Sequence, residues 1–140
     1  MKPLREAFNE AKEKKVILAH GASCHGLDAI NSFPGNKWLD IALCRVNHNG
    51  TRMDTPKRTD TDDVGDVAQV TTRVKQIRKQ GTGLIGMKLV GEGRFTRPED
   101  RDAAIRYAFN VGGVDAVTIG YKNTAEIDEA IERINTQLNT

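Results

Sequence analysis

The chain has 140 residues, the length of one domain, of which 38% are hydrophobic and 29% are charged. Its net charge of +2 gives no electrostatic argument for nucleic acid as a partner. No apolar run approaches the roughly 20 residues of a membrane-spanning helix, and the amino-terminal segment lacks the apolar stretch of a signal peptide. Two cysteines, Cys24 and Cys44, do not make a disulfide framework, so we expect a reduced, cytoplasmic protein.

Amphipathic segments and apolar runs alternate along the chain. The spacing of apolar residues predicts a first surface helix over 3–14, with a buried stripe made by Leu4, Ala7, Phe8 and Ala11. Short apolar runs predict buried parallel strands at 16–22, 39–46, 84–90 and 114–119. Further helices are expected at 25–33, 64–80, 97–110 and 124–138. The polar segment 48–63 predicts a long loop, of a length that is usually functional or mobile.

Two of the predicted helices have capping signals at their starts. Thr96 and Glu99 have the spacing of a capping box, and Asn123 with Glu126 is expected to cap the last helix. The last helix also repeats apolar residues at helical spacing, which predicts a buried stripe made by Ile127, Ile131, Ile134 and Leu138.

The order of the predicted elements is one helix followed by four strand–helix steps. Such alternation indicates an α/β protein with a parallel sheet and right-handed crossovers, in a single domain over 1–140. Two architectures share this order: a (β/α)4 half of a TIM barrel preceded by one helix, and a small open doubly wound sheet. A complete (β/α)8 barrel usually needs about 250 residues, so this chain is too short for one.

Four stretches are more specific: ILAHGASCHG at 17–26, GTGLIGMKLVGEGR at 81–94, AIRYAFNVGGVDAVTIGYKN at 104–123 and TAEIDEAIERI at 124–134. In this order and spacing they resemble the C-terminal half of aldo-keto reductases, and the resemblance covers nearly the whole chain. It is closest to the bacterial branch whose seventh strand reads GMK before a Gly-rich turn. The four strands then look like barrel strands five to eight, which favours the half barrel over the open sheet.

The resemblance implies a nucleotide site without the catalytic groups. Aldo-keto reductases transfer a hydride from NADPH to a carbonyl with an Asp, a Tyr, a Lys and a His that lie in the first half of the barrel. No position of this chain matches those four residues, so we expect no catalytic residue and no competent reductase from this chain alone. The cofactor that the resemblance implies is NADP(H), at a partial or vestigial site.

At the nicotinamide end, the resemblance implies roles for residues at the ends of two strands. Ser23 closes the strand where the family holds the nicotinamide carboxamide with a Ser-Asn pair, but Cys24 replaces the Asn here. Many family members place an aromatic residue near Met87 to stack on the nicotinamide, and Met87 has no ring. Lys88 follows at the mouth of the sheet; its alternative role is an ion pair with Glu92 or Asp115.

At the phosphate and adenosine end, the resemblance implies two further segments. Glycines in the turn after the third strand let backbone amides approach a pyrophosphate, and an arginine adds a charge-assisted contact, at Gly91, Gly93 and Arg94. After the fourth strand, a basic residue meets the 2′-phosphate and polar residues hold the adenosine, at Gly120, Lys122, Asn123 and Glu126. The plain alternative for each is a turn glycine or a solvated side chain.

Several other arrangements remain open. Arg45 and Asn47 close the second strand and either line a ligand cavity or pair with the acidic segment 54–63. The histidines and cysteines lack metal-ligand spacing, so no metal site is expected, and the adjacent Cys24 and His25 are not expected to form a catalytic pair.

Half a ring of strands leaves two free edges. We therefore expect a homodimer or higher homo-oligomer that completes a barrel-like assembly, with no nucleic acid and no membrane as partner. A separate chain that supplies the first half, giving an NADPH-dependent oxidoreductase, and a non-enzymatic scaffold are the alternatives.

Overall fold

The structure is a computed structural model that describes residues 2–56 and 64–139. The helices in this part are α1 Lys2–Glu13, α2 Leu27–Asn31, α3 Val67–Lys79, α4 Pro98–Tyr107 and α5 Thr124–Leu138. The strands are β1 Gly21–Ser23, β2 Ile41–Arg45, β3 Gly83–Met87 and β4 Ala116–Val117. A 3-10 turn, η1 (Gly91–Gly93), follows β3, and a π-helical turn, η2 (Ala108–Gly112), continues α4. This order, one helix and four strand–helix steps, confirms the predicted α/β (β/α)4 arrangement.

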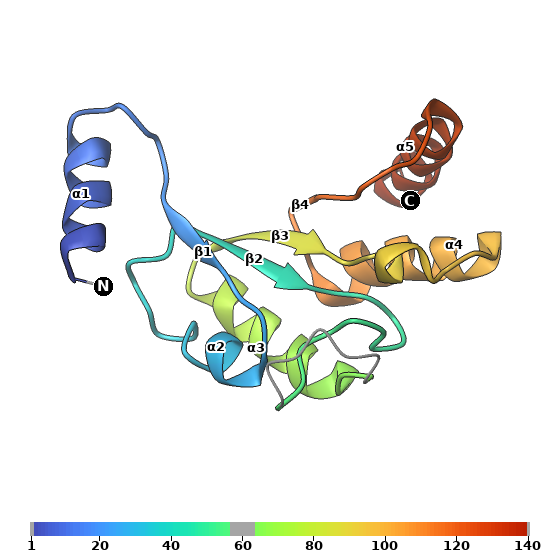
Figure 1. Cartoon of the computed structure of the whole chain (residues 1–140), viewed down its shortest axis with the longest axis horizontal. Coiled ribbons are helices and arrows are strands. Elements are labelled where there is room, and N and C mark those ends of the chain that lie inside the picture. The colour runs from blue at the N-terminus through green and yellow to red at the C-terminus, as the bar shows by residue number, and fades with distance from the viewer. Residues whose placement is uncertain (1, 57–63, 140) are drawn as a thin grey trace.

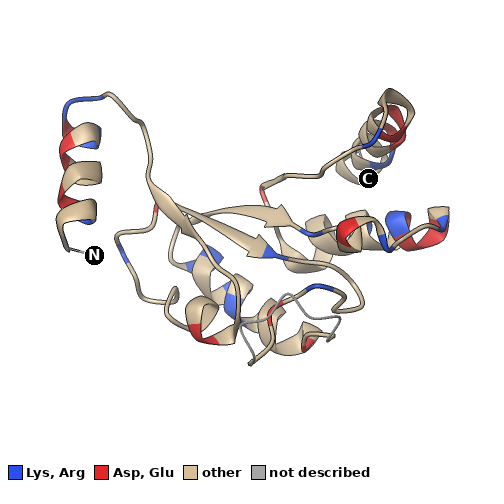
Figure 2. Ribbon diagram, in the orientation of Figure 1, with Lys and Arg blue, Asp and Glu red and all other residues tan. Residues whose placement is uncertain are grey.

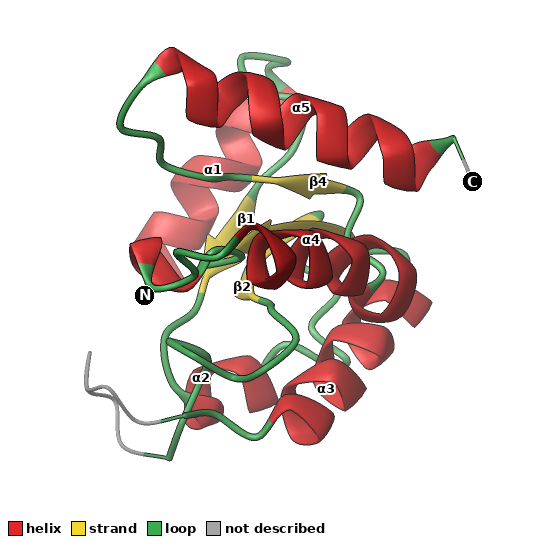
Figure 3. Cartoon of the chain, turned by 90° about the vertical axis from the view of Figure 1, so that its right-hand side faces the viewer, coloured by secondary structure: helices red, strands yellow, loops and turns green. Residues whose placement is uncertain are grey.

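The four strands form one sheet in chain order, β1-β2-β3-β4, and every neighbouring pair is parallel (Figure 1). A helix or a helical turn connects each strand to the next, as parallel pairs require. Gly21 approaches β2 so closely that a Cβ atom there would lie 1.9 Å from the carbonyl oxygen of Ile41. Figure 3 views the chain from the side toward which the strands run in Figure 1.

Helices cover one face of the sheet. The opposite face is buried at the carboxyl ends of β2 and β3, at Arg45 and Met87, and the described residues leave it open nearer the amino ends of the strands. Ala42, Cys44 and Leu84 are buried on the covered face, where α2 and α3 pack beneath the strands. Register places Ile41, Leu43 and Ile85 on the opposite face, and these large apolar side chains are only half-buried. The core of the described chain therefore lies between the sheet and its helices on one side.

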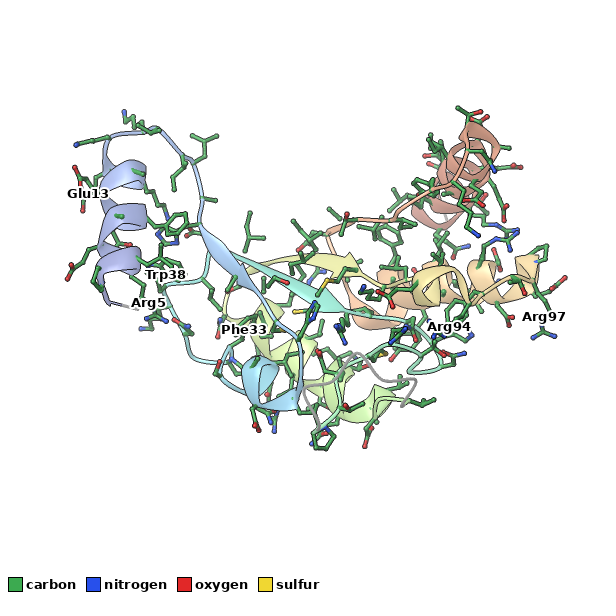
Figure 4. All side chains as sticks on the ribbon, viewed as in Figure 1. Arg5, Glu13, Phe33, Trp38, Arg94 and Arg97 are labelled. Atoms are coloured by element: carbon green, nitrogen blue, oxygen red, sulfur yellow. The ribbon has the colours of Figure 1, made fainter. Side chains whose placement is uncertain are left out.

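Helix α1 is attached to the amino end of the sheet. Lys12 Nζ donates to both carboxylate oxygens of Asp40, at 2.7 and 2.5 Å, and the backbone N–H of His20 donates to the same carboxylate. The ammonium of Lys12 holds the pKa of Asp40 below its usual range. Arg5 lies over the Trp38 ring at 5.0 Å, and Figure 4 shows the two labelled side chains together beside α1. These contacts hold α1 beside the sheet, off its open face (Figure 1).

The predicted first strand is longer than the observed one. Residues 16–22 were expected to be a buried strand, but β1 is Gly21–Ser23, and Val16 and Leu18 are 75% and 91% exposed. Backbone pairing with β2 begins only at the carbonyl of His20, which accepts from the Asp40 N–H. The register of β1 with β2 places 16–19 opposite 36–39, a turn in which the Leu39 N–H donates to the Asn36 carbonyl, so this apolar run has no strand to pair with.

The predicted buried stripes of the first and last helices are wrong for most of their residues, although Ala11 is half-buried and Ile134 packs against the core. Leu4 and Phe8 of α1 are exposed, and so are Ile127, Ile131 and Leu138 of α5. The side chain that α5 does bury is Ala130, on the face toward α4. The periodicity that predicted these helices is present, but the neighbours that would cover their stripes are not among the described residues.

Capping was predicted correctly for one helix and wrongly for the other. Asn123 caps α5 by accepting from the Glu126 N–H at 3.0 Å, and the Glu126 carboxylate accepts from the Lys122 N–H at 2.9 Å. At α4 the cap position is Arg97, which makes no side-chain capping bond, and Pro98 is the first helical residue. Pro98 fixes the start of α4 one residue later than a capping box at Thr96 requires.

None of the helices found between residues 2 and 56 or 64 and 139 combines the length and the apolar character needed to cross a membrane.

Candidate functional site

A cavity lies at the carboxyl ends of β3 and β4. Its volume is about 810 Å³, within the range of small-molecule sites. The end of β3 and the turn η1 form one side, α4 and α5 form another, and the segment 118–122 closes it. The carboxyl ends of parallel strands are where α/β proteins commonly bind ligands, because loops and helix starts converge there.

Six of the eleven predicted site residues line this cavity. They come from both predicted segments and from the end of β3, and they are Met87, Lys88, Gly93, Gly120, Lys122 and Glu126. The apolar part of the lining includes Leu89, Phe95 and Ile105. The structure thus brings together groups up to 39 positions apart in sequence at one end of the sheet.

The turn after β3 has a left-handed backbone at several positions. Lys88, Gly91 and Glu92 have φ values of 59°, 58° and 56°. A Cβ atom on Gly91 would lie 3.0 Å from the Phe95 ring and 3.2 Å from Thr51, so glycine is needed there for space as well as for conformation. Gly91 is buried beneath the turn, while Gly93 faces the cavity.

Lys88 is held by an ion pair. Its ammonium contacts the Glu92 carboxylate, which also lies 2.8 Å from Arg52 Nε. This agrees with the first of the two alternative partners expected for Lys88, and Asp115 instead pairs with Arg78. A lysine engaged in this way contributes to the shape and charge of the cavity wall.

A network of ion pairs joins the two helices of the cavity. Arg101 of α4 donates to both oxygens of Glu129 on α5, at 2.8 and 3.1 Å, and Arg133 Nε donates to Glu129 at 2.9 Å. Arg133 also lies 3.3 Å from Asp102. Hydrogen bonding from Arg101 holds the pKa of Glu129 below its usual range, with Arg133 acting in the same direction and burial opposing. These cations are engaged with carboxylates, so they hold α5 against α4.

Replacing Glu129 by glutamine is expected to lower the free energy of unfolding by about 1 kcal/mol at pH 7, because partly exposed bidentate pairs contribute about that much. The pKa of Glu129 is lowered in the folded state, so its contribution is present above the ordinary glutamate range and is lost as the pH falls through the lowered value. Urea unfolding at pH 7 and pH 3 measures this. The exposed neighbour Glu132 on the same helix supplies the control, E132Q, for which we expect no change at either pH. A deficit of E129Q that is no smaller at pH 3 than at pH 7 would contradict the assignment.

Lys122 is the cation of the cavity that has no carboxylate partner. Among residues 2–56 and 64–139 its ammonium makes no ion pair, whereas Lys88, Arg101 and Arg133 all do. It is exposed and lies just before the capped start of α5, where the helix dipole favours an anion. Tyr121 precedes it and also lines the cavity, and burial raises the pKa of its phenol above the usual value.

The other predicted site residues lie outside the lining of the cavity. Gly91 lies under the turn, and Asn123 is engaged as the cap of α5. Arg94 is exposed beside η1, near the start of α4 in Figure 4. Ser23 is exposed on the edge strand β1, and Cys24 is buried after it. The residues expected at the nicotinamide end therefore lie in two places. Met87 and Lys88 line this cavity, whereas Ser23 and Cys24 lie at the end of β1.

Cys24 belongs to a buried polar cluster at the carboxyl ends of β1 and β2. Its thiol and that of Cys44 are both free, and the hydrogen bond between them, together with burial, raises the pKa of Cys24. Next to them Arg45 contacts His25 Nδ1 at 2.7 Å and the buried carboxylate of Asp54 at 3.9 Å. Pairing of Arg45 with the acidic loop was one of the two expectations, and it is the one observed here.

The second residue predicted at the end of this strand, Asn47, lies in the turn that follows β2 and makes a hydrogen bond within it. Asn47 caps the turn that follows β2 by accepting from the Gly50 N–H at 2.8 Å. Positions 57–63 of the predicted polar loop lie outside the described residues. In the part of the chain that is described, no group of three or more His, Cys, Asp and Glu side chains is placed to hold a metal ion.

Sequence reasoning found Glu126 of α5 but missed two basic residues on the helices that line the cavity. Arg101 and Arg133 follow no strand, and the sequence patterns assign them no role in a site. Arg101 and Glu129 are 28 positions apart, so no local spacing predicts their contact. The i,i+4 spacing of Glu129 and Arg133 is the one signal in the sequence that pointed to part of this network.

A comparison with known protein families finds no family that matches this chain, and a search of curated proteins finds no similar sequence. The resemblance to aldo-keto reductases therefore rests on the four stretches of sequence alone.

Proposed function

We propose that the chain binds NADP(H) through the adenosine 2′-phosphate and pyrophosphate, in the cavity at the carboxyl ends of β3 and β4. The observation that supports this most directly is the gathering there of six residues for which the resemblance implies cofactor contact. Lys122, the cation without a carboxylate partner, would meet the 2′-phosphate. The turn η1 would lie against the pyrophosphate where Gly93 faces the cavity; within the turn, the Gly91 and Gly93 N–H groups donate to the Lys88 and Val90 carbonyls.

The charges of the cavity agree with an anionic ligand. The lining carries four basic side chains and three carboxylates. Each carboxylate is engaged: Glu92 with Lys88, Glu129 with Arg101, and Glu126 with the Lys122 N–H. The lining therefore has one more basic side chain than carboxylates. Among the described residues, the lining cation without a carboxylate partner is Lys122, at the end of the segment 118–122.

We propose no hydride transfer by this chain alone. The catalytic Asp, Tyr, Lys and His of the resembling family have no counterpart here. Within the described lining of the cavity there is no histidine and no aspartate, and Lys88 is tied to Glu92. The replacement of an amide by Cys24 and of an aromatic ring by Met87 would leave the nicotinamide end weakly held.

A fluorescence titration with NADPH, run beside NADH, tests the proposal. The expected result is saturable binding of both, with NADPH about tenfold tighter, because a charge-assisted contact to the 2′-phosphate is worth about 1.4 kcal/mol at an exposed site. Equal affinities would contradict the phosphate contact. Absence of any binding at millimolar nucleotide would favour the scaffold alternative, and hydride transfer that appears only after adding another chain would favour a split oxidoreductase.

A further inference from the structure

We propose that a second copy of this chain packs its open sheet face against the open face of the first, with α5 of each copy beside α1 of the other. This inference concerns a different surface from the nucleotide cavity and does not depend on it. Three observations carry it: an apolar sheet face without a cover, two helices with uncovered apolar stripes, and opposite charges on those helices.

The open face has the chemistry of a buried surface. Ile41, Leu43 and Ile85 project from it, and a shallow hollow of about 300 Å³ lies beside β1 and β2. The hollow is lined by small or apolar residues together with His20, Ile41 and Leu43. Parallel sheets are normally covered on both faces, because their strands are apolar on both. Here the described chain supplies a cover for one face.

The uncovered face lies between two helices that also expose apolar residues. Figure 1 shows α1 at the end where the strands begin and α5 toward the end where they finish, both extending to the side away from α2 and α3. Phe8 on α1 and Ile131 on α5 are 39% and 52% exposed. We call the open sheet face together with these two helices the trough, with α1 and α5 as its walls and the sheet as its floor. The walls and the floor both expose apolar residues.

The two walls carry opposite charge. Residues 2–15, which include α1, have five basic and three acidic residues, a net charge of +2. Residues 124–138, which form α5, have four acidic and one basic residue, a net charge of −3; of these, Asp128 and Glu132 lie outside the lining of the cavity. Figure 2 shows basic residues where α1 ends and acidic residues on α5. Each wall is therefore complementary in charge to the opposite wall of another copy.

Geometry selects the arrangement of the two copies. A two-fold axis perpendicular to the strands, passing above the open face, exchanges the two ends of the trough. It places α5 of one copy next to α1 of the other on both sides, and it stacks the two open faces. An axis parallel to the strands would instead continue the sheet from β4 to the partner's β1 and would leave α1 and α5 at opposite ends.

Sedimentation equilibrium of the whole chain tests self-association first. The expected species has twice the 15.4 kDa mass of the chain. A monomer across the accessible range of concentration would overturn the proposal, as would a stable complex in which a different polypeptide occupies the open face.

Reversing charge on one wall at a time tests the pairing of the walls. The α5 variant combines Asp128→Lys with Glu132→Lys, and the α1 variant combines Lys14→Glu with Lys15→Glu. Each is expected to raise the dimer Kd by at least about tenfold, because like charges then meet across the contact. An equimolar mixture of the two variants should restore wild-type affinity, since opposite charges meet again at both contacts.

A matched variant on α3 controls for the change in net charge. Lys75→Glu with Lys79→Glu alters net charge as the α1 variant does, on a helix that covers the other face of the sheet, and its Kd should equal that of wild type. Circular dichroism confirms that each variant folds. Unchanged affinity in both wall variants, or a mixture that fails to recover, would overturn the arrangement.

Amide exchange in the wild-type dimer separates the two possible axes and needs no variant. The Cys24 N–H donates to Leu43 across the ladder, so the N–H of its neighbour Ser23 faces the free edge of β1. Stacked faces leave that amide in fast exchange. Slow exchange at Ser23 would show that β4 of the partner pairs with this edge, and it would overturn the stacked arrangement.

Discussion

Replacing Lys122 by alanine is expected to raise the Kd for NADPH about tenfold and to leave the Kd for NADH nearly unchanged. Lys122 is the lining cation without a carboxylate partner in the described chain, so its ammonium is available to a phosphate. NADH lacks the 2′-phosphate, so it does not lose this contact. The factor corresponds to about 1.4 kcal/mol, the lower end for hydrogen bonds to charged groups, because the site is open to water.

The matched control for this prediction is Lys75→Ala. Lys75 is an exposed lysine on α3, away from the cavity, and its loss changes net charge equally. It should leave both dissociation constants unchanged. A Lys122→Ala variant that weakens NADPH and NADH by the same factor would show that Lys122 acts on the fold of the site or on the shared part of the nucleotide, against the 2′-phosphate assignment.

Truncation of Asp54 to alanine is expected to destabilise the fold by roughly 3 kcal/mol, the larger of the two effects in free energy. The Asp54 side chain is fully buried, and its Oδ1 accepts from the Gly26 N–H at 2.7 Å. Arg45 lies 3.9 Å away and is itself buried. Removal of the carboxylate leaves a buried donor and a buried guanidinium without this acceptor. Denaturant unfolding measures the loss.

Asn at position 54 separates the hydrogen bond from the charge. Burial raises the pKa of Asp54 above its usual value, so the folded state binds a proton there more readily than the unfolded state does. The wild-type protein is therefore most stable, as far as Asp54 is concerned, below the ordinary aspartate pKa, where this carboxyl is protonated. This contribution to the free energy of unfolding is lost as the pH rises through the raised pKa. Asp54→Asn keeps an acceptor for Gly26 without titrating, so we expect a loss of about 1 kcal/mol that shrinks as the pH rises.

An exposed aspartate on α2 provides the comparison for Asp54. Asp28→Ala should change the free energy of unfolding by less than about 0.5 kcal/mol, as surface substitutions usually do. If Asp54→Ala were as mild as Asp28→Ala, the buried cluster at the ends of β1 and β2 would contribute nothing to stability.

The elements that could be predicted well from the sequence are those whose signals are local. Helix α5 begins and ends where expected, because Asn123 caps it and its periodicity runs unbroken to Leu138. The parallel sheet follows from the alternation of elements, whereas the order β1-β2-β3-β4 was favoured over a doubly wound sheet only by the resemblance. The capping box at Thr96 failed because Pro98 defines the start of α4 more strongly than the capping side chain does.

The features that could not be predicted depend on neighbours. The run at 16–19 is as apolar as a buried strand, yet it stays outside the sheet because the segment in register with it, 36–39, forms a turn and leaves it no neighbour to pair with. The stripes of α1 and α5 are uncovered for the same reason. In the candidate site, residues at strand ends were predictable from their place after a strand. Arg101 and Glu129 meet only through the packing of α4 on α5.

Calorimetric titration with adenosine 2′,5′-bisphosphate, beside adenosine 5′-monophosphate, tests the nucleotide site most directly, because neither ligand has the nicotinamide end that Cys24 and Met87 leave weakly held. The proposal predicts that the bisphosphate binds about tenfold tighter in the wild type, and that Lys122→Ala removes this preference. Equal or undetectable binding of the two nucleotides would contradict a phosphate site at the carboxyl ends of β3 and β4.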